Sequence, residues 1–357
     1  MGLGAIVVMG AEQDGFCSTT AGTTAGGALS GQPVSCVEVL GRSVIERTIE
    51  RLLRAEVEEI SIVVAKEISH LVQPFSSGLD KLQVRVVSDT ACAVADTLRN
   101  YAERDIEHSF LMSANSYSET DLLDLFYFHK EARQTATRAK DCEGFLDFWV
   151  VNCANAAQEN VAELLFSTKS NAVSYFVREY VSRLNHPRDL RKLASDMLRG
   201  VCSSRPSGKE IKPGIWVGEG AEIHRRARIV APAYVGRGSK VKEDTLITRC
   251  SNIERGCHVD AGTVVEDSSV LPNTHIGIWL DVCHSVANGN KLLSLERDVV
   301  VTISDPSVMR FNGSARKEAL QSLSSSRVKE KKQIAADSRN ETPAPEPWQL
   351  GANPIQG

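Results

Sequence analysis

An aliphatic residue recurs at every sixth position over a long stretch of the C-terminal half. The series is Val217, Ile223, Ile229, Val235, Val241, Ile247, Ile253, Val259, Val265 and Leu271. Small residues such as Ser239 and Thr263 stand two positions before most of them. Because alternate residues of a strand point to one face, each hexad supplies one large and one small inward side chain. A period of six fits neither a helix nor a long strand, so it predicts short strands joined by tight corners.

Glycines mark the corners of this repeat. Gly220, Gly238 and Gly256 recur at a spacing of three hexads. This spacing predicts that one corner is stacked above itself in successive triangular coils, with glycine accepting the backbone conformation of the corner. The hexads resemble the left-handed parallel β-helix of hexapeptide-repeat proteins. We expect the register to slip at Gly277 and one more irregular coil, carrying Val299 to Val301, to close the stack.

The N-terminal half has alternating strand-like and helix-like segments instead. Five apolar runs predict strands: Ile6 to Met9, Ile60 to Ala65, Val84 to Ser88, Phe110 to Ser113 and Phe145 to Val151. Periodic segments predict helices at 43–56, 91–104, 119–130, 155–168, 172–184 and 187–199. Ser43 and Glu46 form a capping-box signature, and Pro187 and Gly200 bracket the last helix. Such alternation is typical of a doubly wound, mostly parallel sheet with its site at the carboxyl ends of the strands.

The predicted organisation has four parts. Residues 1–202 form the α/β domain, 203–212 a polar linker, 213–310 the repeat, and 311–357 a short helix and a disordered tail, in which prolines, serines and charges leave little apolar surface to bury.

Composition narrows the function classes. The formal net charge is -4, so no broad basic surface is expected for nucleic acid or for an anionic membrane. No apolar run approaches the ~20 residues of a membrane span. The nine cysteines are scattered without a C-x-x-C pair, which indicates reduced thiols rather than a disulfide framework or a zinc site. We therefore expect a soluble, cytoplasmic protein.

The order of an α/β domain followed by hexads resembles the sugar-1-phosphate nucleotidyltransferases, notably mannose-1-phosphate guanylyltransferases and glucose-1-phosphate adenylyltransferases. Residues 5–11 resemble the first strand and phosphate loop of that family, residues 38–46 the stretch after its signature lysine, and residues 57–64 its second strand. The resemblance implies metal-assisted transfer of a nucleotidyl group to a sugar phosphate with release of pyrophosphate. That chemistry needs backbone N–H groups on the phosphates, an Arg, a Lys and carboxylates that hold Mg²⁺.

Several of the matching positions depart from the family pattern. The loop A-G-G-x-G-T-R falls on residues 9–15, where Gly10 and Ala11 remain as candidate ligand contacts and Gly15 replaces the arginine. Val34 stands where the signature lysine belongs. Two cations that would neutralise a triphosphate are therefore missing.

The metal positions also differ. Asn115 and Ser116 stand where the family has Gly-Asp, and Arg183 stands where the second aspartate belongs. We therefore predict no metal site of the usual kind and hypothesise that Arg183 pairs with a phosphate-bearing ligand without magnesium. The alternative is a rearranged, active site that holds Mg²⁺ through other carboxylates. The candidates are Asp89, Glu119, Asp121 and Asp147.

The repeat offers a third function class. Many hexapeptide proteins are acyltransferases with a histidine general base between subunits. The available histidines are His224, His258, His275 and His284. None of them lies in a distinctive motif.

The sequence thus predicts an α/β doubly wound nucleotidyltransferase-like domain followed by a short left-handed parallel β-helix. The first function hypothesis is a sugar-nucleotide pathway protein with a degenerate active site, which binds a nucleotide sugar or sugar phosphate as a regulatory or assembly subunit. It would form a homo-oligomer, or a hetero-oligomer with an active paralogue. An active nucleotidyltransferase, with Mg²⁺ as cofactor, and a hexapeptide acyltransferase are the alternatives.

Overall fold

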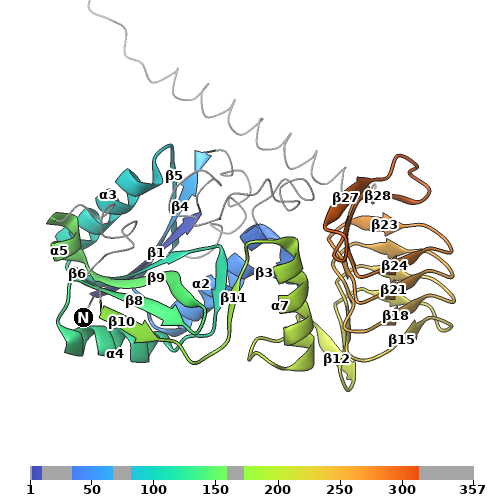
Figure 1. Cartoon of the computed structure of the whole chain (residues 1–357), viewed down its shortest axis with the longest axis horizontal. Helices are drawn as coiled ribbons and strands as arrows, with labels where there is room; N and C mark the ends of the chain where they lie inside the picture. The colour runs from blue at the N-terminus through green and yellow to red at the C-terminus, as the bar shows by residue number, and fades with distance from the viewer. Residues whose placement is uncertain (1, 10–33, 67–81, 159–172, 313–357) are drawn as a thin grey trace, which may run out of the picture. The chain divides into compact units, whose positions relative to one another are not determined.

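The computed structural model describes residues 2–9, 34–66, 82–158 and 173–312. Residues Met1–Asn312 belong to one compact unit. It contains a mixed α/β sheet domain followed by a strand-rich region with parallel strands (Figure 1). The helix and tail predicted for 311–357 lie almost wholly outside the described residues.

The sheet of the α/β domain has seven strands in the order β10-β8-β9-β6-β1-β4-β5. Their bounds are β1 (Gly2–Met9), β4 (Glu59–Ala65), β5 (Leu82–Val87), β6 (Ile106–Ser113), β8 (Ala136–Asp141), β9 (Gly144–Asn152) and β10 (Val173–Phe176). Strand β9 runs antiparallel to both of its neighbours, and the other pairs are parallel. The five predicted strands fall on β1, β4, β5, β6 and β9, whereas β8 was not predicted.

Helices cover both faces of this sheet. Along β1, Ala5 and Val7 pack with α2 (Val44–Arg54) and α4 (Leu122–Ala132), while Ile6 and Val8 pack with α3 (Thr90–Glu103) and α5 (Cys153–Gln158). This alternation places a hydrophobic core on each side of the sheet. The predicted capping box of α2 is present, because the Ser43 side chain accepts from the Glu46 N–H and the Glu46 carboxylate accepts from the Ser43 N–H.

The segment after α5 corrects one expectation. A helix was predicted over 172–184, but the chain forms β10 and β11 (Val181–Arg183) there. The β-branched and aromatic residues that gave the helical spacing pair with strands instead, β10 with β8 and β11 with β7 (Ser116–Ser118). Helix α7 (Pro187–Arg199) confirms the last predicted helix, with Gly200 as its left-handed C-cap. Of the helix predicted at 155–168, residues after Gln158 lie outside the described residues.

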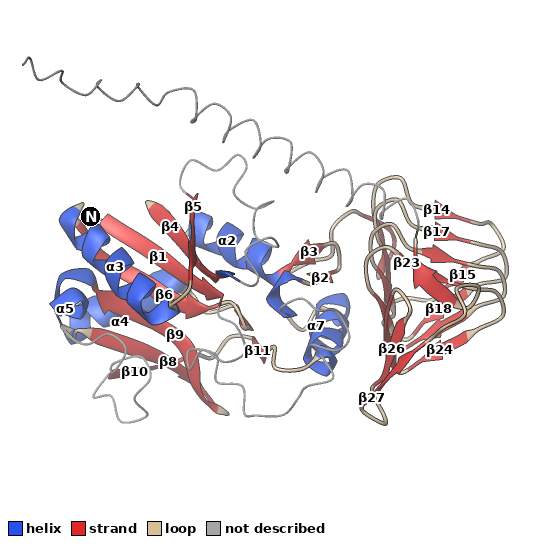
Figure 2. Ribbon diagram, turned by 90° about the horizontal axis from the view of Figure 1, so that it is seen from above, coloured by secondary structure: helices blue, strands red, loops and turns tan. Residues whose placement is uncertain are grey.

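Three sheets build the strand-rich region (Figure 2). The first contains β12 (Lys209–Lys212), β13 (Ile215–Val217), β16 (Ala233–Val235), β19 (Asn252–Ile253), β22 (Ser269–Val270), β25 (Ser285–Asn288), β26 (Lys291–Ser294) and β27 (Val299–Thr302). The second contains β14 (Glu222–Ile223), β17 (Lys240–Val241), β20 (His258–Val259), β23 (Thr274–Ile276) and β28 (Met309–Phe311). The third contains β15 (Arg228–Ile229), β18 (Leu246–Thr248), β21 (Val264–Glu266) and β24 (Asp281–Cys283).

From β13 to β25 the chain visits the three sheets in turn, and each strand pairs in parallel with the strand three further along. Glu222, for example, pairs with Lys240, which stands three hexads later in the sequence. The three sheets enclose one apolar interior, and the large residues of the hexads from Val235 to Val265 are buried in it. Gly220, Gly238 and Gly256 all have φ near +65°, and N–H groups of the second and third donate to the coil below, so the predicted stacking of this corner is present.

The register shifts earlier than predicted. Asn252 pairs with Ser269 and not with Val270, the partner that an unbroken period of six would give. The reason is that the corner at Asp267 is one residue shorter than the corner at Arg249 and Cys250. Val270 therefore occupies the interior position that the hexad series assigned to Leu271, and Leu271 packs in the cluster that includes residues of α7. A shift of one residue moves a side chain to the opposite face of the sheet, so Leu271 faces out of the interior and Val270 faces into it.

The end of the stack also differs from the prediction. Val299 to Val301 form no further coil, because β26 pairs antiparallel with β25 and β27 pairs antiparallel with β26. On the second sheet, β28 pairs antiparallel with β23. Antiparallel strands thus cover two of the three sheets at this end.

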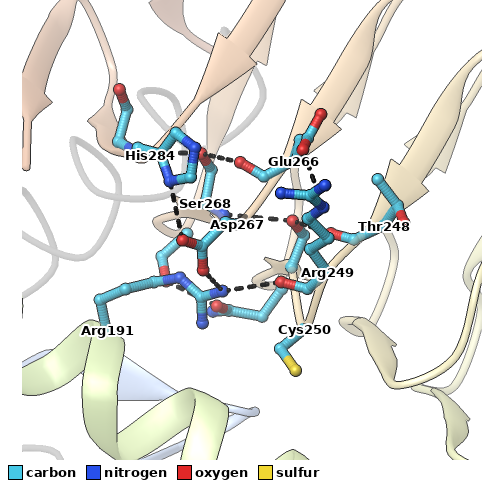
Figure 3. A network of polar contacts seen from close by, with 12 residues as sticks. Arg191, Thr248, Arg249, Cys250, Glu266, Asp267, Ser268 and His284 are labelled. Carbon is cyan, nitrogen blue, oxygen red and sulfur yellow. Dashed lines mark hydrogen bonds and ion pairs between the residues drawn. The ribbon is translucent and has the colours of Figure 1, made fainter.

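Among the polar contacts that join the α/β domain to the strand-rich region, two involve a buried charged side chain, Glu254 or Arg191. The turn between β2 (Glu38–Val39) and β3 (Arg42–Ser43) follows the short 3-10 helix η1 (Val34–Cys36). Its Leu40 and Gly41 N–H groups donate to the fully buried Glu254 carboxylate at 2.8 and 2.9 Å. On α7, the Arg191 guanidinium donates to the Asp267 carboxylate at 2.7 Å (Figure 3). The predicted linker, 203–212, connects the two regions along the chain and ends in β12. The Ser207 N–H within it donates to the Leu40 carbonyl.

Among the described residues, no helix combines the length and apolar character required to cross a bilayer.

Candidate functional site

Three of the predicted ligand residues meet at the carboxyl end of β6. Asn115 and Ser116 follow this strand, and Ser116 lies opposite Arg183 in the antiparallel pair of β7 and β11. The Leu184 N–H donates to the Asn115 carbonyl at 2.9 Å. The neighbouring Ala114 N–H donates to the Val8 carbonyl near the end of β1. Gly10 and Ala11, which follow β1 directly, lie outside the described residues.

The Arg183 side chain is held by carboxylates of the turn between β8 and β9. Its Nη1 and Nη2 donate to the two Asp141 oxygens at 2.8 and 2.7 Å, and Nη1 also donates to Glu143 Oε2 at 2.8 Å. Hydrogen bonding to Asp141 raises the pKa of Arg183. Burial raises the pKa of Asp141, but the hydrogen bonds and charge of Arg183, together with the hydrogen bonds from the Glu143 and Gly144 N–H groups, outweigh it, so the net shift is downward. A phosphate would have to compete with both carboxylates for this cation.

The four alternative metal carboxylates also have partners. Asp89 and Asp121 accept from N–H groups at the starts of α3 and α4, as N-caps. Glu119 accepts from the Ser203 and Ser204 N–H groups, at 2.8 and 3.0 Å. Asp147 forms an ion pair with Arg138 at 3.2 Å, although burial raises its pKa. Within the described residues, no three His, Cys, Asp or Glu side chains are grouped as ligands of one metal ion.

A small cavity adjoins the end of β6. Its volume is about 30 Å³, and Ser113, Ser116, Ser118 and Arg51 are among its lining residues. A space of this size has room for about one water molecule. By itself it is too small for a sugar phosphate.

Two of the predicted histidines share one carboxylate in the strand-rich region. His258 on β20 and His275 on β23 are neighbours in the second sheet. Their Nε2 atoms lie 3.1 and 2.9 Å from the Asp260 carboxylate. Burial lowers the pKa of His258 and outweighs the opposite effect of Asp260. A carboxylate on one ring nitrogen orients an imidazole for proton transfer through the other nitrogen.

The other two histidines are separate from this pair. His224 is exposed, and its Nδ1 accepts from the Arg226 N–H at 3.3 Å. His284 Nδ1 lies 2.8 Å from Asp267, whose carboxylate also binds Arg191 (Figure 3). The contact with Asp267 places His284 in the junction between the two regions, so the structure does not bring the four histidines to one site.

A second cavity, larger than the one at β6, was not predicted. It has a volume of about 910 Å³ and lies between α2, the segment 117–123 and the segment 203–208. We call it the arginine cleft, because five arginines line it: Arg42, Arg47, Arg51, Arg54 and Arg205. The sequence does carry a signal for it, since Arg47, Arg51 and Arg54 are spaced i, i+4 and i+7 along one helix and therefore share a face. That helix was predicted from its periodicity and its capping box, and its basic face was not considered.

No family model matches the chain, and a search of curated proteins finds no match either.

Proposed function

We propose that this protein is a member of the sugar-1-phosphate nucleotidyltransferase family that has lost catalysis and acts in a sugar-nucleotide pathway as a ligand-binding, regulatory or assembly subunit. The proposal includes the interpretation of the strand-rich region as a short left-handed parallel β-helix. Support for that interpretation comes from the three sheets visited in turn and from the pairing of each strand with its equivalent one coil later. The order of the two regions along the chain supports the family assignment.

The observation that carries the proposal is the set of ion pairs that the Arg183 guanidinium forms. The resemblance places this residue at a metal position, and its guanidinium there holds Asp141 and Glu143 instead of leaving their carboxylates to Mg²⁺. Nucleotidyl transfer needs a metal ion to stabilise the charge that develops on the phosphates. An arginine stands at this metal position in place of a carboxylate, and the two carboxylates beside it, Asp141 and Glu143, are already paired with that arginine. We therefore expect ligand binding at this edge of the sheet without turnover.

The ligand class is a nucleotide sugar or a sugar phosphate. Asn115, Ser116 and Arg183 lie together at the carboxyl edge, and Gly10 and Ala11 follow the adjacent β1 in sequence. Amide, hydroxyl and guanidinium groups donate hydrogen bonds to phosphate and sugar oxygens. We expect this binding to be independent of magnesium, so that Mg²⁺ is a cofactor only if the protein is active.

The first experiment measures turnover and binding in parallel. Purified full-length protein is incubated with a nucleoside triphosphate, Mg²⁺ and glucose 1-phosphate or mannose 1-phosphate, and pyrophosphate release is followed. We expect no release above background. Nucleotide sugars should raise the melting temperature equally with Mg²⁺ and with EDTA. Steady pyrophosphate release would overturn the proposal and establish the active nucleotidyltransferase.

The second experiment tests the role of Arg183. We expect R183A to abolish the stabilisation by nucleotide sugar, with R178A, an exposed arginine nearby, as the matched control. Glu143, whose side chain is 71% exposed, competes with the ligand for the Arg183 guanidinium. The E143Q variant should therefore bind the nucleotide sugar about threefold more tightly. Unchanged binding in both R183A and E143Q would remove Arg183 from the site.

The acyltransferase alternative rests on one observation. Asp260 is hydrogen-bonded to His275 Nε2 at 2.9 Å and lies 3.1 Å from His258 Nε2 without a hydrogen bond, and a carboxylate beside an imidazole can assist it as a general base. If this function is correct, the protein consumes acetyl-CoA in the presence of an acceptor, and H258A abolishes the consumption. H224A, which alters an exposed histidine without a carboxylate partner among the described contacts, is the control. Absence of acetyl-CoA consumption with amino-sugar and sugar acceptors would count against it.

We also propose that the protein assembles, either with itself or with an active paralogue. Strands β14 and β15 lie at the ends of their sheets, each with one paired side among the described strands. Ile223 and Ile229 on these strands are only partly buried, whereas the equivalent residues of the next coil, Val241 and Ile247, are buried. An uncovered end of this kind favours association. Sedimentation of the full-length protein, alone and with a co-expressed paralogue, tests this.

A further inference from the structure

The arginine cleft carries more positive charge than its acidic residues neutralise. Four acidic residues line it: Glu50, Glu119, Asp121 and Glu179. Glu50 forms ion pairs with Arg42 and, at 3.9 Å, with Arg54. Glu119 accepts from two backbone N–H groups and from Tyr117, and Asp121 caps α4. Most of the acidic oxygens are therefore occupied by groups other than the remaining arginines.

Arg47 is the buried cation of this cleft. The residue is 6% exposed, and its hydrogen-bond acceptors are neutral: the Val39 and Arg205 carbonyls and the Ser204 hydroxyl, at 2.8, 3.2 and 2.6 Å. Its buried Nε has no hydrogen-bond partner among the described residues. Burial lowers the pKa of Arg47, which reflects the cost of keeping a cation out of water. The charges of Glu254 and Glu50 act in the opposite direction, but neither carboxylate forms an ion pair with Arg47 among the described residues, so this buried cation can still bind an anion from outside the chain.

Arg51 and the segment 203–208 supply further donors. The Arg51 guanidinium donates to the Ser118 and Thr120 carbonyls, which fix its position without neutralising its charge. Arg205 is exposed and has no ion pair within the described part of the chain. The Ser207 hydroxyl is buried without a hydrogen-bond partner among the described residues and belongs to the same lining. Guanidinium and hydroxyl donors on opposite walls suit the oxygens of a phosphate group.

We propose that the arginine cleft binds the phosphate groups of a phosphorylated small molecule. A volume of about 910 Å³ is at the upper end of the range of small-molecule pockets, so a ligand with two phosphates or a phosphorylated sugar fits it better than a single oxyanion. The cleft shares only Arg51 and Leu122 with the small cavity at β6, and Arg183 is not part of its lining. The site is therefore separate from the one in the proposed function and does not depend on it.

Inorganic pyrophosphate is the probe for the test. Its binding to the full-length protein is measured by titration calorimetry at low ionic strength, where charge attraction is least screened. We expect one site per chain. Because Arg205 is exposed and Arg51 lines the cavity, R205Q should weaken binding about fivefold and R51Q about tenfold, since each loses a charge-assisted hydrogen bond. R237Q removes an exposed arginine in the strand-rich region and should leave binding unchanged.

The controls separate this site from the one at Arg183. Melting temperatures verify that the variants fold. If R51Q does not fold, R205Q alone provides the test. R183A should leave pyrophosphate binding intact even where it abolishes nucleotide-sugar binding. The inference is overturned if pyrophosphate does not bind, if R205Q binds as tightly as the unmodified protein, or if R183A and not R205Q weakens the binding.

Discussion

The α/β domain and the strand-rich region bury their apolar residues in different ways. In the α/β domain the central strand β1 pairs with β4, as Gly4 does with Glu59, and with β6, as Ala5 does with Phe110, so long stretches of chain separate the partners. In the strand-rich region, each strand pairs with its equivalent only one coil later, and this closure is repeated along the stack. Bringing together strands that are close in the sequence costs less conformational entropy per contact than bringing together strands that are far apart.

This difference shows how each region is specified. The sheet needs two cores, because α2 and α4 cover one face and α3 and α5 the other. The stacked strands need one interior, which a single large and a single small residue per hexad fill. The small residues include buried hydroxyls, such as that of Ser239, which donates to the Glu254 carbonyl at 2.6 Å. The repeat therefore encodes both the packing and the hydrogen bonds of its interior.

The largest expected effect tests whether the two cores are equally well packed. Ile253 in the stack and Ile62 in the sheet are both fully buried. Each change to alanine should lower the free energy of unfolding by about 4 kcal/mol, through lost burial and the cavity left behind. I211A, at an exposed position, is the control. Chemical denaturation followed by circular dichroism measures the effects, and a cost for I253A far below that for I62A would show that the stack is loosely packed.

The next largest effect concerns the buried carboxyl between the regions. Burial raises the pKa of Glu254 to about 7. The folded protein therefore keeps this proton between the ordinary pKa of 4.5 and pH 7, whereas the unfolded chain releases it. The stabilisation is complete below pH 4.5 and is lost as the pH rises through 7, by about 3 kcal/mol in total.

The E254Q variant tests this directly, because its side chain cannot titrate. The difference in unfolding free energy between E254Q and the unmodified protein should change between pH 5 and pH 8. E103Q, at an exposed position of α3, should show no such change. A pH-independent difference for E254Q would mean that Glu254 is already ionised at pH 5.

A smaller effect is expected at the second contact between the regions. Only 5% of the Arg191 side chain is exposed, and its carboxylate partner is Asp267. D267N keeps a residue that tolerates the positive φ of this corner but removes the charge, so it should cost about 2 kcal/mol. The double variant R191M/D267N should recover part of that loss, since it no longer buries a cation. Equal stability of D267N and the unmodified protein would show that the regions are held together without this ion pair.

The smallest effect compares two corners of one stack. Gly220 and Gly256 have φ values of +68° and +65°. G220A should cost about 1 kcal/mol from the backbone conformation alone, because nothing lies within 4 Å of the added carbon. In G256A the added carbon would lie 2.4 Å from Asn273 Oδ1, so that side chain must also move. Thermal unfolding should rank G256A below G220A, and the reverse order would contradict the stacking of these corners.

Sequence reasoning predicted the repeat well because its signal is local. Inward positions from Val235 to Val265 follow from counting. The shorter corner at Asp267 was missed, because aliphatic residues stand at both 270 and 271 and the loss of one residue left the series intact. In the sheet, β8 was missed because its sequence ATRAKD lacks an apolar run, and its pairing with β9 and β10 forms the strand.

The candidate site was predicted only in part. Asn115, Ser116 and Arg183, the residues that the resemblance selected, lie close together, because β7 pairs with β11. It could not show that Asp141 and Glu143 bind Arg183, because they belong to a turn that lies far earlier in the chain. The arginine cleft depends on the segment 203–208 packing near α2, a contact that no local pattern records.

The short corner at Asp267 has a consequence for engineering this protein. The coils before and after it are out of phase by one residue, so coils cannot be exchanged freely across that point. Inserting a single residue there would give this corner the length of the one at Arg249 and Cys250, whereas the corner one coil later, at His284, would keep the short form. The same insertion would move the carboxylate that binds Arg191. The length of this corner therefore determines both the spacing of the repeat and the position of the carboxylate that contacts α7.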